Sequence, residues 1–253
     1  GESPLPVIAP ATPAGCFDSA VEAVRVAVRY RTPVILLSDT FLANSSEPWR
    51  IPSTAELPEI DPRFAEGPNA DGEFLPYLRD KIGARPWAIP GTPGLQHRIG
   101  GLEKEDGSGN ISYDPGNHAR MTALRAQKLE SLAAEIADLA VDADEGAELL
   151  VLGWGSTYGV VRATARRIRE RGIPIALAHL RHLNPLPANT GEVVRAYPKV
   201  LVPELNTGQL SRILRSEFLV DVRSYNKVEG MPILADDLEP VILEMLGKEE
   251  ASE

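Results

Sequence analysis

The residues of this sequence that could take part in catalysis or binding follow apolar runs in its second half. The run at 149–153 precedes a glycine turn with two hydroxyls, the run at 173–180 precedes a histidine, and the run at 200–203 precedes a carboxylate and two amides. These candidates are Gly155, Ser156, Thr157, His182, Glu204, Asn206 and Gln209. A helix start with free N–H groups can bind an anion, and His182 or Glu204 could act as a general acid or base. Nothing completes a catalytic triad, so we predict no catalytic residue and treat the set as candidate anion, substrate or interface contacts.

The glycine turn Gly153-Trp154-Gly155 lies between an apolar run and a helix, where dinucleotide-binding folds hold a pyrophosphate. Two features of that fingerprint are missing. The third small residue falls on Tyr158, with a glycine one position late at Gly159, and the next apolar run ends in histidines and an arginine where an acidic residue would hold the ribose. The sequence therefore favours a structural tight turn, while the start of the following helix stays open to an anion.

The elements that position these side chains begin with a βαβ unit at 149–180. Its helix carries apolar residues at helical spacing and arginines on the opposite side. The apolar positions are Val161, Thr164, Ala165 and Ile168. Ser156 or Thr157 can cap this helix, and Gly172 can end it. The elements expected next are a loop at 181–187, a helix near 190–196, strands at 200–204 and 218–222, and a last helix capped by Asp236. Strands buried on both faces predict an open, parallel α/β sheet.

The opening of the chain repeats this pattern in a shorter form. A strand at 7–9, a helix capped by Asp18 and a buried strand at 34–37 make a β-α-β unit. Two strands and one helix are too few for an independent domain, and the chain begins at Gly1 without a methionine. We therefore expect residues 1–47 to be the last part of a domain that begins upstream.

Prolines and glycines punctuate the chain from 48 to 117, yet apolar anchors argue against disorder there. The anchors are Phe64, Phe74, Tyr77, Leu78, Trp87 and Ile89. We expect an ordered arm that lies across another surface, such as a partner subunit. A helix capped by Asn117, with an apolar stripe that continues to Leu139, would connect this arm to the second domain.

His97 and Arg98 lie in the most glycine-rich part of the arm, and both are candidate contacts. An arginine there can hold a carboxylate or a phosphate. The alternative is an ion pair in solvent between Arg98 and Glu103 or Glu105, which would have no functional meaning.

Composition narrows the classes of function. The chain has 253 residues, of which 43% are hydrophobic and 25% charged, as in a soluble globular protein. A net charge of −10 argues against nucleic acid as a partner. No apolar run approaches about 18 residues, so we expect no membrane span and no signal peptide. The single cysteine, Cys16, cannot alone hold a zinc or an iron–sulfur cluster, and we expect no metal site. We expect a cytoplasmic protein.

Four stretches, in their order and spacing, resemble the alpha subunit of the 2-oxoacid:ferredoxin oxidoreductases, most closely the 2-oxoglutarate type. They read TPVILLSD at 32–39, GTPGLQHRIGG at 91–101, GWGST at 153–157 and PELNTGQL at 203–210. Together they extend the resemblance over nearly the whole chain, as the C-terminal portion of such a subunit. The resemblance implies a partial thiamine-pyrimidine-type α/β domain at 1–47, the arm and connecting helix at 48–147, a transketolase C-terminal-like domain at 148–247 and a tail at 248–253.

The resemblance also implies a reaction. A 2-oxoacid is decarboxylated on thiamine diphosphate, the acyl group passes to coenzyme A, and ferredoxin is reduced through iron–sulfur clusters. The glutamate that activates the thiamine ring would lie upstream of Gly1, and the diphosphate and magnesium motif and the cluster cysteines would lie in other parts of the assembly, usually the beta subunit. We therefore expect a chain that is part of an oligomeric enzyme but is inactive, and binds no cofactor, when isolated.

Two alternatives remain open from the sequence. One is an E1-type beta chain of an oxoacid dehydrogenase, which carries the same kind of C-terminal domain. The other is a non-catalytic module for subunit assembly. The long arm at 48–117, with its His97-Arg98 loop, favours the ferredoxin type. The identity of the 2-oxoacid stays open beyond the resemblance to the 2-oxoglutarate type.

Overall fold

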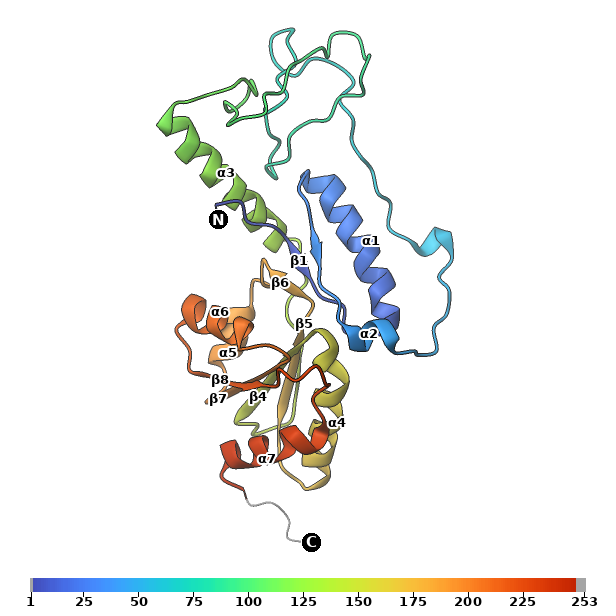
Figure 1. Ribbon diagram of the computed structural model, residues 1–253, viewed down its shortest axis with the longest axis vertical. Coiled ribbons are helices and arrows are strands. Elements are labelled where there is room, and N and C mark those ends of the chain that lie inside the picture. Colours follow the sequence, from blue (N-terminus) through green and yellow to red (C-terminus); the bar gives the residue numbers. More distant parts are fainter. Residues whose placement is uncertain (1, 249–253) are drawn as a thin grey trace. The chain divides into compact units, whose positions relative to one another are not determined.

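The computed structural model describes residues 2–248 (Figure 1). Apart from Lys248, the tail expected at 248–253 lies outside the described residues. The chain divides into two compact units, and neither is a single stretch of sequence. The first unit consists of Gly1–Val7, Ala20–Ile35 and Arg50–Glu135, and the second of Ile8–Ser19, Leu36–Trp49 and Ile136–Glu253.

The second unit is built on a five-stranded sheet with the order β3-β5-β4-β7-β8. Its strands are β3 (Val141–Ala143), β4 (Leu149–Trp154), β5 (Ala176–Leu180), β7 (Lys199–Glu204) and β8 (Val222–Asn226). The pairs β4–β5, β4–β7 and β7–β8 are parallel. Parallel strands need crossover helices, which is why strands and helices alternate along this part of the chain.

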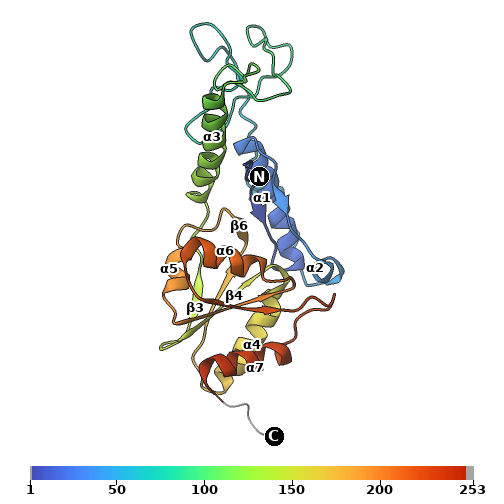
Figure 2. The same ribbon diagram turned by 60° about the vertical axis from the view of Figure 1, so that its left-hand side comes forward.

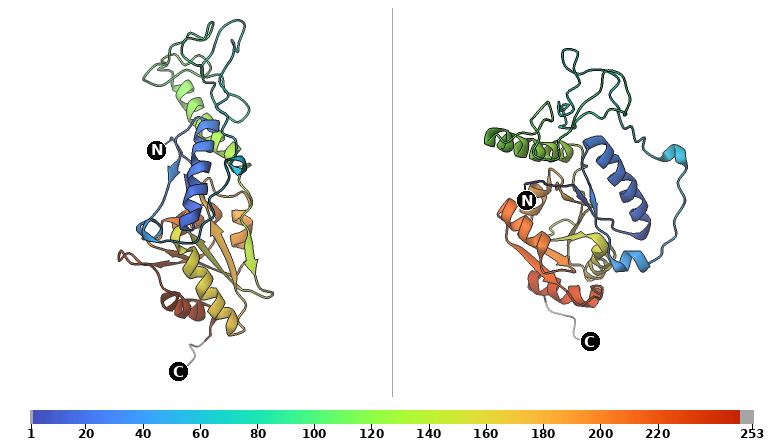
Figure 3. Two further views of the ribbon diagram at one scale, coloured as in Figure 1. Left: turned by 90° about the vertical axis from the view of Figure 1, so that its right-hand side faces the viewer. Right: turned by 45° about the horizontal axis from the view of Figure 1, so that its top comes forward.

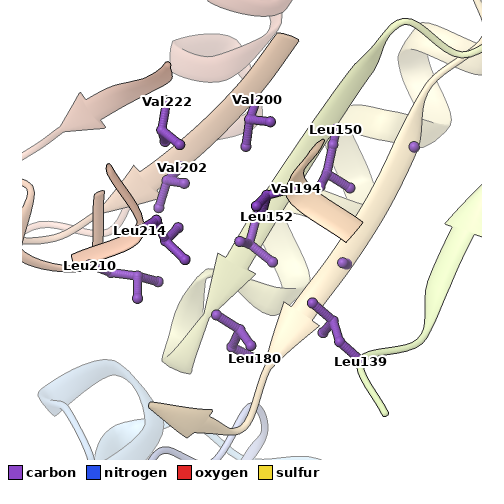
Figure 4. Packing of buried hydrophobic residues seen from close by; sticks show 12 residues of the cluster. Leu139, Leu150, Leu152, Leu180, Val194, Val200, Val202, Leu210, Leu214 and Val222 are labelled. Atoms are coloured by element: carbon purple, nitrogen blue, oxygen red, sulfur yellow. The ribbon is translucent and has the colours of Figure 1, made fainter. Parts of the chain in front are cut away.

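Helices cover both faces of this sheet (Figure 2). On one face lie α4 (Tyr158–Glu170) and α7 (Ala235–Leu246), and on the other lie α5 (Thr190–Arg195) and α6 (Gln209–Phe218). Because successive side chains of a strand point to opposite faces, β4 feeds both layers. Leu150 and Leu152 pack with α5 and α6, as Figure 4 shows, while Leu149 and Val151 pack with α4 and α7. The all-apolar run that predicted a doubly covered strand is explained by this arrangement.

The expected all-parallel sheet is wrong at one edge. The strand β3 pairs with β5 in the antiparallel direction, with Val141 opposite Ala178. All three residues of β3 are exposed, and the strand is too short and too polar to be read from an apolar pattern. The sheet is therefore mixed, with one short antiparallel edge strand.

Several predicted boundaries in the second unit need correction. The strand expected at 218–222 begins at Val222, because Phe218 ends α6 and Leu219 closes it in the left-handed conformation with a φ of 53°. The loop expected at 181–187 contains a short strand, β6 (His182–Asn184). The last helix is not capped by Asp236: the Leu234 N–H donates to Asp237 instead, at 2.8 Å, and Asp236 forms an ion pair with Arg167.

The opening β-α-β pattern is confirmed in outline. It consists of β1 (Val7–Ile8), α1 (Pro13–Tyr30) and β2 (Ile35–Leu36), and a small sheet has the order β2-β1-β6. The helix starts before the expected cap Asp18, since the Thr12 hydroxyl accepts a hydrogen bond from the Gly15 N–H at 3.1 Å and a proline fits the first turn. The strand β2, expected to be buried, is the edge strand, and Ile35 is 42% exposed.

The first unit contains α3 (Pro115–Ala133), which ends earlier than its apolar stripe predicts. Its cap is Asp114, whose carboxylate accepts the Asn117 N–H at 2.7 Å. The predicted cap Asn117 binds the arm instead, through Asp106 and Lys104. Leu139 continues the helical spacing by chance, because it lies in extended chain whose backbone N–H and carbonyl both bond to the Asn189 side chain.

The arm between α2 (Thr40–Asn44) and α3 has almost no regular structure, only the single turn η1 (Thr54–Glu56) (Figures 1 and 3). Side chains hold it in place: the Phe64 and Trp87 rings stack at 6.4 Å, and the Arg31 guanidinium lies 3.9 Å from the Trp87 ring centre. Such contacts distinguish an ordered arm from a disordered linker. Among the described residues no helix is long and apolar enough to span a bilayer.

Candidate functional site

A pocket of about 290 Å³ lies beyond the carboxyl ends of β4 and β7, where open parallel sheets usually bind ligands. Five of the predicted residues line it: Gly155, Ser156, Thr157, Asn206 and Gln209. The structure thus brings together two loops that are about 50 residues apart in sequence, as the strand pattern predicts. Further lining comes from Leu37, Ser38, Asp39, Leu42, Trp154 and Leu205.

The glycine turn after β4 is built by its own hydroxyl. The Thr157 Oγ1 donates to the Trp154 carbonyl at 2.7 Å and accepts from the Trp154 N–H at 3.0 Å. The turn continues as η2 (Gly155–Thr157) into α4, and neither Ser156 nor Thr157 caps that helix with its side chain, contrary to expectation. A Cβ at Gly153 would lie 3.0 Å from His179 Nδ1 and Thr157 Oγ1, so close packing explains this glycine without a nucleotide.

The pocket contains a carboxylate that the sequence did not indicate as part of the site. The Ser156 hydroxyl donates to Asp39 Oδ2, and Asp39 Oδ1 accepts the Leu42 N–H at 2.9 Å as the cap of α2. The only sequence signal is that Asp39 follows the apolar run at 34–37. A bound anion would meet this negative charge. The pocket therefore suits a hydrogen-bond donor or a cation better than the anion expected at the glycine turn.

Glu204 lies behind the pocket and holds α6 in place. It is fully buried, and its two oxygens accept the Leu210 N–H at 2.9 Å, the Ser211 N–H at 3.0 Å and the Ser211 hydroxyl at 2.7 Å. A carboxylate at a helix N-terminus satisfies free N–H groups and interacts well with the helix dipole. These bonds account for Glu204 as a structural group, which leaves no geometric support for an acid–base function.

Asn206 also builds the loop before α6. Its Oδ1 accepts the N–H groups of Gly208 and Gln209, both at 2.8 Å. Gly208 has a φ of +82°, and a Cβ there would lie 3.0 Å from the Ser224 Oγ. The amide of Asn206 is thereby committed to an Asx-type turn, while Gln209 is exposed at the rim of the pocket.

His182 lies elsewhere, in a separate hollow of about 430 Å³ in the same unit. That hollow is also lined by His179, Tyr158 and Arg162. Burial, reinforced by the charge of Arg181, lowers the pKa of His179 to about 4, and the Tyr158 ring meets the imidazole edge-on at 5.0 Å. His179 is therefore a neutral core group at physiological pH.

His97 and Arg98 belong to the first unit. The His97 Nδ1 lies 2.7 Å from the Leu95 carbonyl and its ring meets Phe74 at 5.0 Å, so this exposed histidine is held against the arm. Arg98 is exposed, and within residues 2–248 it forms no ion pair with Glu103 or Glu105. The solvent ion pair considered from the sequence is therefore wrong.

The side chains of residues 2–248 do not make a site for magnesium or for an iron–sulfur cluster. Among the described residues, no three His, Cys, Asp or Glu side chains converge as metal ligands. The half-buried Cys16 is the only cysteine in the sequence, and a cluster needs several thiolates.

Comparison with known proteins gives the context for this geometry. Residues 2–113 match the family model described as pyruvate flavodoxin/ferredoxin oxidoreductase, thiamine diphosphate-binding. The chain is 57% identical over 241 residues to the 2-oxoglutarate oxidoreductase subunit KorA of Mycobacterium tuberculosis, covering 94% of this chain and 36% of that protein. It is 31% identical over 255 residues to subunit alpha of the 2-oxoacid:ferredoxin oxidoreductase 1 of Aeropyrum pernix, covering 97% of this chain and 39% of that protein.

A solved structure has the same fold. The 2-oxoglutarate:ferredoxin oxidoreductase from Magnetococcus marinus, with 2-oxoglutarate, coenzyme A and succinyl-CoA bound, superposes with a TM-score of 0.88 at 30% identity. The match covers 96% of this chain and 42% of that one. The α/β fold class predicted from the sequence is therefore confirmed, and fold and matched domain together define a 2-oxoacid oxidoreductase component. The chain belongs to the family of 2-oxoacid:ferredoxin oxidoreductase alpha subunits. It spans less than half the length of these relatives.

Proposed function

We propose that this chain is part of the alpha subunit of a thiamine-diphosphate-dependent 2-oxoglutarate:ferredoxin oxidoreductase. The complex would convert a 2-oxoacid and coenzyme A to acyl-CoA and CO₂ while it reduces ferredoxin. The observation that carries this proposal is the identity of 57% with a 2-oxoglutarate oxidoreductase subunit over 94% of the chain. The superposition with a TM-score of 0.88 supports it independently.

The proposal assigns the cofactors to the whole complex. Thiamine diphosphate, magnesium and an iron–sulfur cluster would be held with a beta subunit, and the assembly would be an oligomer in the cytoplasm. The single cysteine in the sequence, too few for a cluster, supports that division. Within the chain, residues 1–47 would complete a pyrimidine-binding-type domain, residues 48–147 would form the arm and connecting helix, and residues 148–247 would be the transketolase C-terminal-like domain.

The candidate residues would act by contact and positioning. The side chains of Ser156 and Gln209 reach the pocket beside Asp39, and they would bind a donor group of a substrate or of a partner subunit. Glu204 and Asn206 would keep the start of α6 in the position that shapes this pocket. Arg98, exposed on the arm, would contact an acidic group outside this chain.

The test uses the complete alpha subunit co-expressed with its beta subunit. Anaerobic viologen reduction is followed with coenzyme A and either 2-oxoglutarate or pyruvate. We expect reduction with 2-oxoglutarate and none from the 253-residue chain alone. A loaded complex that reduces viologen with pyruvate but not with 2-oxoglutarate contradicts the substrate, and one that reduces it with neither contradicts the reaction.

The same assay tests the pocket. The variant Ser156→Ala removes the hydroxyl beside Asp39, and loss of one contact should lower kcat/KM about three- to tenfold. The matched control is Ser216→Ala, which changes an exposed serine on α6. Equal activity of the two variants would show that the pocket contributes nothing to the reaction, while the proposed activity itself would stand.

A further inference from the structure

The first unit contains a hollow of about 400 Å³ with a strongly positive lining. Its charged side chains are six cations and one carboxylate, in a chain whose net charge is −10. The cations are Arg31, Arg79, Arg85, Lys104, Arg125 and Lys128, and the carboxylate is Glu103. Like charges gathered around one hollow repel one another, so the excess of cations needs a physical explanation.

Part of the positive charge is balanced within the unit. Arg79 Nη1 lies 3.1 Å from Asp106 Oδ1, and Arg125 Nη1 lies 3.8 Å from Glu103 Oε1. The Arg31 guanidinium donates to the carbonyls of Val28 and Pro62, which fix it against Trp87 without neutralising it.

Within the described residues, four cations of the lining form no ion pair with a carboxylate: Arg31, Arg85, Lys104 and Lys128. Within residues 2–248, neither Lys128 nor Arg85 forms an ion pair or a hydrogen bond with a carboxylate. Lys128 is partly buried on α3, and burial, followed by the charges of Arg79 and Arg85, lowers its pKa to about 8, with Asp80 opposing the shift. A bound anion stabilises the charged form of such a lysine, because its charge is not balanced by a carboxylate.

The hollow is also shaped to receive a ligand. Arg79 and Arg85 both lie 5.5 Å from the centre of the Tyr77 ring, so one aromatic side chain orients two guanidinium groups. The Arg79 side chain is only 11% exposed, and Met121 and Leu129 add apolar wall. Pre-oriented guanidinium groups with little access to water bind oxyanions better than flexible surface lysines do.

We propose that this hollow binds a phosphate-bearing anion, with Lys128 and Arg85 as its direct contacts and Arg79 and Arg125 as flanking charges. A carboxylate carries one negative charge, whereas a diphosphate carries several and matches the excess of cations in the lining. The hollow shares no lining residue with the pocket beside Asp39. The diphosphate can be free or part of a nucleotide, since both present the same oxyanion.

The test measures how fast an amine-reactive reagent labels Lys128, by peptide mass spectrometry of the complete chain at pH 8. Millimolar inorganic pyrophosphate should slow this labelling about tenfold, because a bound anion restores the charge of the amine and covers it. The control is Lys81, an exposed lysine on the arm of the same unit, whose labelling should not change. Greater protection by ADP than by pyrophosphate would identify a nucleotide as the source, and equal protection a free diphosphate.

A variant pair completes the test. Arg85→Gln should abolish the protection of Lys128, whereas Arg98→Gln, which changes an exposed arginine outside the hollow, should leave it intact. The protection measured on the unaltered chain does not depend on whether either variant folds. Labelling of Lys128 that is unchanged by pyrophosphate and ADP, or protection of Lys81 to the same extent, overturns the proposal.

Discussion

Glu204→Gln is the most informative single substitution in the second unit, because it changes charge and hydrogen bonding with little change of shape. The native carboxylate is fully buried and accepts three hydrogen bonds from the first turn of α6. A glutamine has one carbonyl oxygen and one amino group. If its oxygen takes the two bonds from Ser211, its amino group faces the Leu210 N–H, and two donors are left opposed.

The expected cost follows from these contacts. One buried donor without an acceptor costs about 1–3 kcal/mol. Loss of the negative charge at the helix N-terminus adds about 1 kcal/mol, since the interaction is sheltered from water. We therefore expect Glu204→Gln to lower the free energy of unfolding by about 2–4 kcal/mol.

Urea unfolding followed by tryptophan fluorescence measures this cost, with Trp154 of β4 as a probe in the same unit. The matched control is Glu217→Gln, an exposed glutamate on the same helix, which should stay within about 0.5 kcal/mol of the parent. A Glu204→Gln protein within the same limit would refute the assignment of Glu204 as the group that holds α6, and would reopen a chemical function for it.

Three further predictions concern single groups. The pKa of His179 is lowered to about 4, so the unfolded chain binds more protons than the folded chain below pH 6.5. The free energy of unfolding should therefore fall by about 3 kcal/mol between pH 6.5 and 4. Urea midpoints measured across this range should fall with pH in the parent and lose this dependence in His179→Asn. The pKa of Lys128 is lowered to about 8, so stability should rise as the pH increases from 8 towards 10.5, where the unfolded lysine titrates; a Lys128→Met protein with the same rise speaks against the burial argument. Gly208→Ala places a side chain at a φ of +82° and 3.0 Å from Ser224 Oγ, so it should cost about 1–2 kcal/mol by thermal unfolding, and no measurable cost would mean that the turn relaxes freely.

The sequence predicts the centre of the second unit well. The run at 149–153 is buried on both faces, and a strand of this kind has few alternatives once a helix with one apolar side follows it. Because ligand sites follow from the carboxyl ends of such strands, five of the residues that line the pocket could be named in advance.

The errors have specific physical causes. Asp39 and Ser156 are 117 residues apart, and no local pattern shows that a helix cap in one segment also bonds to a turn in another. Leu139 has helical spacing, but a side-chain amide of Asn189 takes both of its backbone groups. The part that Glu204 plays in holding α6 is likewise absent from any local pattern, because only the three donors around it reveal it. In each case a long-range hydrogen bond outweighs local preference.

The interrupted make-up of the second unit has a consequence for how the polypeptide is made. Its first two segments, Ile8–Ser19 and Leu36–Trp49, leave the ribosome before the 86 residues from Arg50 to Glu135, and all five strands of its main sheet come later still. During that interval the early segments cannot pack against the main sheet of their own unit, because none of its strands has been made. Newly made chains should therefore depend on chaperones until the stretch from Ile136 onward has emerged. A stalled chain that ends near Glu135 lacks every strand of that sheet and should be recognised for degradation.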